Sequence, residues 1–139
     1  MTTVQEAMTK DPAKLSRSAT VAEAAQCMAE RDIGTVLVED ASGLVGMVTD
    51  RDIVVRAVAR GRDPEGTPLT EICSEPLMTV SPDDDVDRVV EIMREKAVRR
   101  VPVVDARKQA VGILSLGDLA RDRDPHSALG KISSAPPNN

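Results

Sequence analysis

The chain contains an internal repeat, and this duplication limits the folds that are open to it. Residues 4–9 align with residues 69–74 at a shift of 65, and residues 45–52 align with residues 111–118 at a shift of 66. The change of shift indicates one extra residue in a loop of the second copy. One copy of about 55 residues would bury too little apolar surface to be stable alone. We therefore expect the two copies to share one core around a pseudo-twofold axis.

Each copy is predicted to have the element order helix, strand, helix, strand, strand, helix, which is an α/β (α+β) fold. Alternating apolar residues predict the strands, and apolar residues at a spacing of three and four predict the helices. In the first copy the predicted elements cover residues 2–8, 14–15, a helix from Thr20, 35–39, 44–48 and 50–59. In the second copy they cover residues 68–73, 79–80, a helix after the acidic run 83–85, 100–104, 110–114 and 117–123.

The repeat also predicts the domain organisation. Residues 1–66 form a first motif with its linker, and residues 67–124 form a second motif. The linker, residues 60–66, is rich in turn-forming residues. Residues 125–139 form a polar tail whose composition is typical of disorder. The two motifs are expected to act as one module.

Composition excludes several classes of function. The chain has no Phe, Tyr or Trp, so the core must be aliphatic and no ring is available to stack on a base. A net charge of -5 argues against a nucleic-acid partner. The apolar runs are too short to cross a membrane, and the N-terminus lacks the basic region and apolar core of a signal peptide. A cytoplasmic protein without a membrane partner is expected.

Catalytic and metal chemistry find little support in the sequence. Cys27 and Cys73 have no neighbouring Cys or His at metal-ligand spacing, so we expect buried, reduced thiols. His126 is the only histidine, and it lies in the polar tail. Since the sequence has no paired nucleophile and base, no metal cluster and no P-loop, we predict a protein that is not an enzyme and has no metal site.

A hydroxyl residue and an aspartate recur three residues apart where a strand is predicted to run into a helix. The pairs are Thr49 with Asp52 and Ser115 with Asp118, each preceded by a glycine and two large aliphatic residues. One interpretation is a capping box, in which side chains and free backbone N–H groups satisfy each other. The other is a binding site for phosphate or sugar hydroxyls, because free N–H groups at a helix N-terminus also bind anions. The residues alone leave both open.

The complete pattern resembles a known family. The segments ERDIGTVLVED and EKAVRRVPVVD, followed by GMVTDRDI and GILSLGDL, resemble a cystathionine-β-synthase (CBS) domain pair, or Bateman module, over about residues 4–122. The chain is similar to small stand-alone bacterial CBS-pair proteins of the hypoxic-response type. The resemblance implies tandem CBS repeats and a non-catalytic regulatory protein for stress or energy sensing. Such a protein senses an adenosine-containing ligand in clefts between the repeats, and needs no cofactor beyond a bound AMP, ADP or ATP.

The resemblance also implies roles for particular residues. Asp52 and Asp118 would accept hydrogen bonds from ribose hydroxyls, and Thr49 and Ser115 would contact phosphate. Two apolar slots would hold adenine, one lined by Leu15, Val36 and Leu37 and the other by Val80, Val101 and Pro102.

The two copies differ where a phosphate would lie. Arg99 and Arg100 are the candidates to neutralise it, since guanidinium binds phosphate bidentately. A solvated pair, or salt bridges to nearby acids, is the alternative for these arginines. The first copy has Gly34 and Thr35 at the same positions, and Arg51 where the second has Gly117. We therefore expect the clefts to differ, with the second copy favoured for phosphate.

A protein of another class is also compatible with the sequence. The predicted helix with Val86, Val89, Val90 and Met93 on one face could dimerise or dock on an unidentified protein partner, with vestigial nucleotide sites. A homodimer is expected in either case, because twofold dimers are the commonest assembly.

Overall fold

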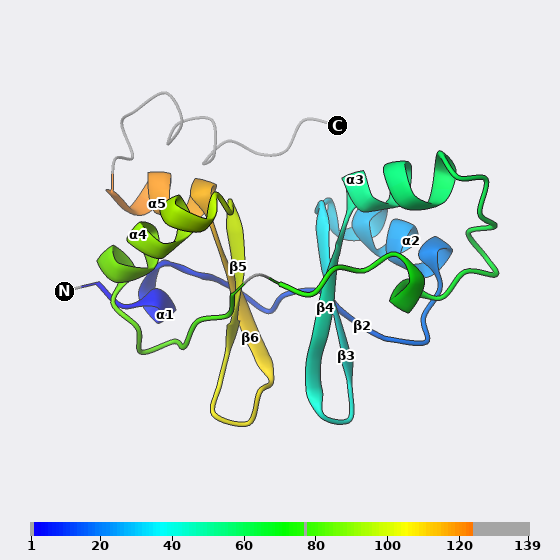
Figure 1. Ribbon diagram of the computed structural model, residues 1–139. Helices are drawn as coiled ribbons and strands as arrows, with labels where there is room; N and C mark the ends of the chain where they lie inside the picture. Colours follow the sequence, from blue (N-terminus) through cyan, green and yellow to red (C-terminus); the bar gives the residue numbers. More distant parts are fainter. Residues whose placement is uncertain (1, 77, 124–139) are drawn as a thin grey trace. The chain divides into compact units, whose positions relative to one another are not determined.

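The computed structural model describes residues 2–76 and 78–123 (Figure 1). The chain divides into two compact units, which are described separately below. One is formed by residues 12–76, and the other by residues 1–11 together with the chain after residue 76. We call them the first-repeat unit and the second-repeat unit, after the copy that supplies most of each.

The first-repeat unit packs helices against a three-stranded sheet. Its elements are β2 (Lys14–Ser16), α2 (Val21–Arg31), β3 (Thr35–Asp40), β4 (Gly43–Thr49), α3 (Asp50–Asp52), the π-helix η1 (Ile53–Val58) and the 3₁₀-helix η2 (Leu69–Glu71). The strand order is β2-β3-β4, with β2 parallel to β3 and β3 antiparallel to β4. The short β3–β4 turn confirms the predicted hairpin.

The second-repeat unit also packs helices against a three-stranded sheet, but its third strand differs. Its elements are α1 (Val4–Ala7), β1 (Thr9–Lys10), α4 (Val86–Lys96), β5 (Arg100–Val104), β6 (Ala110–Ser115) and α5 (Leu116–Arg123). The strand order is β1-β6-β5, and both pairs are antiparallel. Pro102 lies in β5 at one edge of this sheet, as expected for a residue without a backbone donor.

Each unit contains the N-terminal segment of the other copy. Residues 3–10 belong to the first copy, yet Thr9 pairs with Ile113 of β6. In the same way Ser74, which aligns with Thr9, bridges Met47 of β4. The repeat boundaries predicted from the sequence therefore describe the duplication, whereas the compact units describe how its segments pack. The predicted tail, residues 125–139, lies outside the described residues.

Aliphatic side chains form a separate core in each unit, and not the one shared core that we expected from the repeat. The face of α2 that carries Val21, Ala24 and Met28 is buried, and so is the face of α4 that carries Val86, Val89 and Met93. Burying one such side chain contributes about 1.5–3 kcal/mol. The predicted apolar stripe of the second copy is thus confirmed as a core face, with Val90 half-buried at its margin. The prediction that this face could dimerise or dock on a partner is wrong, because Val86, Val89 and Met93 are already buried in their own unit. Within residues 2–76 and 78–123, no helix has both the length and the apolar character needed to cross a membrane.

Three local predictions differ from the structure. The helix expected over 50–59 begins as α3 but continues as a π-helix, in which the Ala59 N–H donates to the Val54 carbonyl. The strand expected at 79–80 is reduced to one parallel bridge between Val80 and Val103. The two cysteines, expected to be buried, are free and only half-buried at the edge of the first core.

Candidate functional site

The two strand-to-helix junctions share one hydrogen-bond pattern. We call residues 49–52 the first junction and residues 115–118 the second junction. In the first, the Thr49 N–H donates to Asp52 Oδ2 at 2.9 Å and the Asp52 N–H donates to Thr49 Oγ1 at 3.1 Å. In the second, the Ser115 N–H donates to Asp118 Oδ2 at 3.0 Å and the Asp118 N–H donates to Ser115 Oγ at 3.1 Å. Both junctions are capping boxes.

Each junction also forms a backbone hydrogen bond with the residue just before the neighbouring strand, β3 or β5. The Asp50 N–H donates to the Gly34 carbonyl at 3.0 Å, and the Leu116 N–H donates to the Arg99 carbonyl at 2.8 Å. Arg100 is the register partner of Ser115. The structure therefore brings the backbone of the predicted arginine pair to the second junction, with both side chains exposed.

At the second junction the aspartate is buried and held by a residue from the other end of the chain. Asp118 is 4% exposed, and its Oδ2 also accepts from Ser115 Oγ at 3.0 Å. Its Oδ1 accepts a hydrogen bond from Thr9 Oγ1 at 2.8 Å, across 109 positions of sequence. Sequence reasoning did not select Thr9, although a hydroxyl at the aligned positions Thr9 and Ser74 was a signal for it.

At the first junction the aspartate, Asp52, lies beside an arginine side chain. The Asp52 side chain is 18% exposed, and its Oδ1 lies 3.8 Å from Arg56 Nε. Arg56 Nη1 also donates to the Ile72 carbonyl at 3.2 Å. Asp50 adds a second carboxylate here, at the position that Leu116 occupies in the second junction. The two junctions are thus alike in backbone and unlike in charge.

The residues predicted to line the adenine slots lie in the sheets, but on both faces of them. Val36 and Val101 belong to the two cores, while Leu37 and Pro102 follow them in sequence and face the opposite side, because side chains alternate along a strand. Leu15 packs against the first core, and Val80 lies inside the second. The slots, and the clefts expected between the copies, stay predictions.

A groove opens beside the second junction, between α4 and α5. Its volume is about 400 Å³. The lining is mostly aliphatic, with two arginines, and consists of Val90, Met93, Arg94, Ala97, Val98, Arg99, Leu116 and Leu119. One of the predicted phosphate ligands therefore lies next to an apolar surface.

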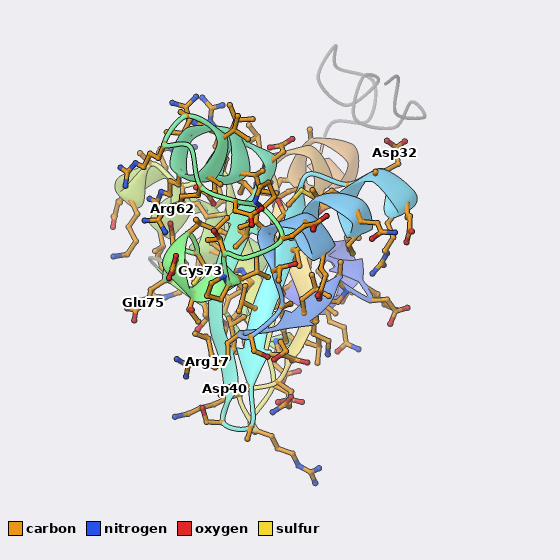
Figure 2. The ribbon with its side chains drawn as sticks, turned by 90° about the vertical axis from the view of Figure 1, so that its right-hand side faces the viewer. Arg17, Asp32, Asp40, Arg62, Cys73 and Glu75 are labelled. Atoms are coloured by element: carbon orange, nitrogen blue, oxygen red, sulfur yellow. The ribbon has the colours of Figure 1, made fainter. Side chains whose placement is uncertain are left out.

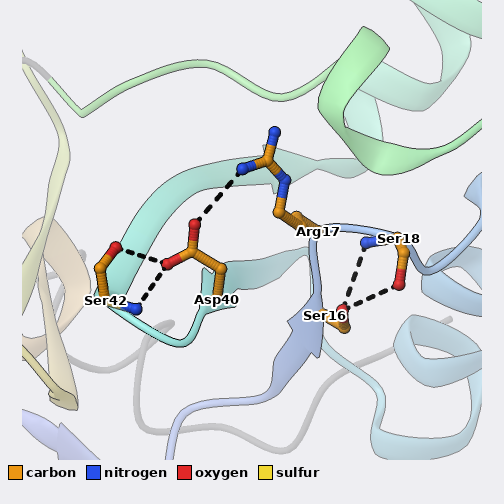
Figure 3. Close-up of polar contacts among 5 residues, drawn as sticks. All are labelled: Ser16, Arg17, Ser18, Asp40 and Ser42. Carbon is orange, nitrogen blue, oxygen red and sulfur yellow. Dashed lines mark hydrogen bonds and ion pairs between the residues drawn. The ribbon is translucent and has the colours of Figure 1, made fainter.

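A second polar cluster lies away from the junctions, at the turn end of the β3–β4 hairpin. Asp40 accepts hydrogen bonds from the Ser42 hydroxyl at 2.6 Å and the Ser42 N–H at 2.8 Å, and Arg17 Nη1 lies 3.4 Å away (Figure 3). Hydrogen bonds from Ser42 and the charge of Arg17 hold the pKa of Asp40 below its usual value of 3.8. Because Thr49 pairs with Thr35 at the other end of the hairpin, this cluster stabilises the turn and takes no part in the first junction.

The cysteines and possible metal ligands do not assemble a further site in the described residues. Cys73 is labelled in Figure 2. Burial raises the pKa of its thiol above 9.0, which disfavours a reactive thiolate. Across residues 2–76 and 78–123, no three His, Cys, Asp or Glu side chains come together to hold a metal ion. His126 lies outside this part of the chain.

Two α/β units with matching junctions define a tandem-repeat module, and the comparison with known families identifies it. The CBS domain model matches residues 4–58 and again residues 69–123. The chain therefore belongs to the CBS domain family, as a tandem pair. Both matches are to the same domain, and no catalytic family is indicated.

Similar proteins include two from bacteria. The chain is 36% identical to the CBS domain-containing protein YhcV of Bacillus subtilis, covering 94% of this chain and 91% of the relative. It is 34% identical to hypoxic response protein 1 of Mycobacterium tuberculosis, covering 93% of this chain and 90% of the relative. The resemblance to stand-alone proteins of the hypoxic-response type is thereby confirmed.

Solved structures of CBS pairs share the fold. A crystal structure of Hypoxic Response Protein I with two coordinated zinc ions has a TM-score of 0.75 at 35% identity, covering 88% of this chain and 99% of the other. The CBS domain protein PAE2072 of Pyrobaculum aerophilum, complexed with AMP, has a TM-score of 0.76 at 29% identity, covering 94% and 96%. The CBS pair of protein MJ0100, in complex with 5′-methylthioadenosine and S-adenosyl-L-methionine, has a TM-score of 0.75 at 29% identity, covering 86% and 94%.

Proposed function

We propose that this protein is a non-catalytic regulatory CBS pair that binds an adenosine-containing ligand of the AMP, ADP or ATP class. The observation that carries the proposal is the second junction, where a buried aspartate and a serine hydroxyl lie beside the Arg99–Arg100 pair. Complexes of similar CBS pairs with AMP and with other adenosyl compounds support the ligand class.

The proposed roles follow from hydrogen-bonding capacity. The carboxylate of Asp118 accepts hydrogen bonds, so a ribose hydroxyl can donate to it by replacing the hydroxyl of Thr9 or Ser115. Ser115 contacts the phosphate, whose charge the guanidinium groups of Arg99 and Arg100 neutralise. Thr49 and Asp52 form the equivalent pair in the first-repeat unit.

Calorimetry with AMP and ATP tests the proposal. Loss of one hydrogen bond to a charged group costs about 1.5–3 kcal/mol, so Asp118→Ala should weaken binding by about tenfold to a hundredfold. Asp83→Ala, which removes an exposed aspartate before α4, is the matched control and should bind as the wild type does. No heat and no thermal shift with any adenosyl ligand would refute the function.

A simple absorbance measurement adds to this test. Because the chain has no Tyr or Trp, the purified protein absorbs very little near 280 nm. A nucleotide that copurifies would therefore dominate the spectrum at 260 nm and could be identified by mass spectrometry.

One observation favours a second candidate, a dimerising or partner-docking protein that acts without a ligand. Three valines are exposed on η1, namely Val54 at 58%, Val55 at 43% and Val58 at 61%. Apolar side chains that cluster on one surface favour association. A homodimer is proposed for either function, and light scattering of wild type and Val54→Lys/Val58→Lys tests it. Equal masses at the monomer value would refute the dimer.

A further inference from the structure

The first junction has a carboxylate, Asp50, at the position where the second junction has the apolar side chain of Leu116. Asp50 and Leu116 are equivalent, since each backbone N–H donates to the carbonyl of the residue that precedes β3 or β5. Asp50 is exposed, and its Oδ1 accepts from the Arg51 N–H at 2.8 Å. This hydrogen bond orients the carboxylate so that its other oxygen, Oδ2, lies next to Gly34.

Gly34 is what makes room for the carboxylate. A Cβ atom at Gly34 would lie 3.0 Å from Asp50 Oδ2, which is closer than nine in ten real Cβ contacts, so the carboxylate would have to shift. The aligned residue in the second-repeat unit is Arg99, whose side chain lines the groove together with Leu116. The same backbone frame therefore presents an anion in one unit and a cation in the other.

The remaining charges at the first junction do not cancel this difference. The guanidinium of Arg56 is already paired with Asp52 and the Ile72 carbonyl. Arg51 is exposed and also lies within the junction, so the two acids, Asp50 and Asp52, are matched in number by Arg51 and Arg56. The second junction has one acid and the Arg99–Arg100 pair.

Electrostatic repulsion of this kind is large enough to select a ligand. For like charges about 6 Å apart at an effective dielectric constant of about 40, Coulomb's law gives about a tenfold change in affinity for each unit of charge. A 5′-phosphate carries between one and two negative charges at neutral pH. A cationic substituent gains by the same factor.

We infer that Asp50 is a specificity-determining residue that excludes phosphate from the first junction. This junction takes nucleosides whose 5′ substituent is neutral or cationic, and the phosphorylated ligand goes to the second junction. The inference rests on the proposed function, because it assigns a ligand charge to each of two nucleoside sites.

Backbone amide NMR spectra of the intact protein test the inference, since they report on each junction separately. Three probes differ only in the 5′ substituent, which is anionic in AMP, neutral in adenosine and cationic in 5′-amino-5′-deoxyadenosine. In the wild type, AMP should shift the amides of residues 115–118 and leave those of residues 49–52 unchanged. The amino nucleoside should shift residues 49–52 at concentrations about tenfold lower than adenosine.

Asp50→Asn keeps the size and the acceptor of the side chain and removes its charge. This variant should bind AMP at the first junction about tenfold more tightly and should lose the preference for the amino nucleoside. Asp63→Asn, in the exposed linker, removes the same charge elsewhere and should behave as the wild type does. Asp50→Leu, which copies Leu116, provides a second variant with the same expected direction.

The outcomes separate this inference from the proposed function. If AMP shifts both junctions equally in the wild type, or if Asp50→Asn leaves the relative affinities of the three probes unchanged, the inference is overturned and the nucleoside sites stand. If adenosine and the amino nucleoside shift only residues 115–118 in every variant, the first junction is not a nucleoside site and the inference is overturned as well. If none of the probes shifts either junction, both the inference and the proposed function fail.

Discussion

Thr9→Val should destabilise the protein although Thr9 lies in a two-residue strand near the N-terminus. Its hydroxyl donates to Asp118 Oδ1 at 2.8 Å, and Asp118 is 4% exposed. A hydrogen bond to a charged group contributes about 1.5–3 kcal/mol. Since Thr9 itself is exposed and water can replace part of the donor, we expect the lower end of this range, about 1.5 kcal/mol.

The corresponding change in melting temperature follows from the size of the chain. The entropy of unfolding is about 2.1 cal/mol/K per residue, so for 139 residues a loss of about 1.5 kcal/mol lowers Tm by about 5 °C. Urea unfolding followed by circular dichroism at 222 nm measures the free energy without an aromatic fluorophore. Valine is close to threonine in shape, so the measured loss reports mainly on the hydroxyl.

Two controls give the Thr9 prediction its specificity. Thr9→Ser keeps a hydroxyl and should recover most of the lost stability. Ser74→Ala alters the aligned position of the other copy, where Asp52 is paired with Arg56 instead, and should cost less than about 0.5 kcal/mol. Equal stability of Thr9→Val and Thr9→Ser, or a Thr9→Val loss no larger than that of Ser74→Ala, would refute the role of this hydrogen bond.

Three further predictions concern packing and ionisation. Gly112→Ala should lower the free energy of unfolding, measured in urea, by about 1–3 kcal/mol, because the new Cβ would lie 2.9 Å from the Thr9 carbonyl and 2.5 Å from Met8 Sδ. Gly66→Ala is the control and should lower it less, since the new Cβ meets only the flexible Asp63 side chain. Ser42→Ala should raise the pKa of Asp40 toward 3.8. The lowered pKa stabilises the folded protein above the unfolded-state pKa, and this contribution is lost as the pH falls through the folded-state pKa, so the variant should be less stable than the wild type at about pH 7. In acid titrations of unfolding the difference should close as Asp40 becomes protonated. In a Cys27→Ser background, Cys73 should react with Ellman's reagent at pH 8 much more slowly in the folded protein than in urea, because burial raises its pKa, and equal rates would contradict this burial.

Local sequence patterns predicted most of the fold. Alternating aliphatic residues placed β3 and β4 to within one residue of the observed ends, because one hairpin register satisfies both the turn and the core. The apolar stripe of α4 was predictable for the same reason, as a single helix face buries Val86, Val89 and Met93. The Thr20 hydroxyl accepts from the Glu23 N–H, so the predicted start of α2 was also correct.

Contacts between distant segments were not predictable from these patterns. The exchange of N-terminal segments depends on which sheet edge residues 9–10 reach, and both β4 and β6 offer a similar edge. The π-helical form of η1 has no periodicity that differs clearly from an α-helix over six residues. The carboxylate of Asp50 over Gly34 depends on a close approach that only the three-dimensional backbone defines.

Both copies need the hydroxyl–aspartate motif for folding, whether or not they bind a ligand. In each copy it satisfies the free N–H groups where a buried strand becomes a helix, so both copies would keep it even if only one bound a nucleoside. The motif therefore carries little information about the ligand. That information lies in the residues brought to the motif from elsewhere, which are Thr9 and Arg99 at one junction and Gly34 and Arg56 at the other. Because these residues come from separate segments, each can change without disturbing the cap, and a duplicated module can diverge in ligand while its fold stays the same.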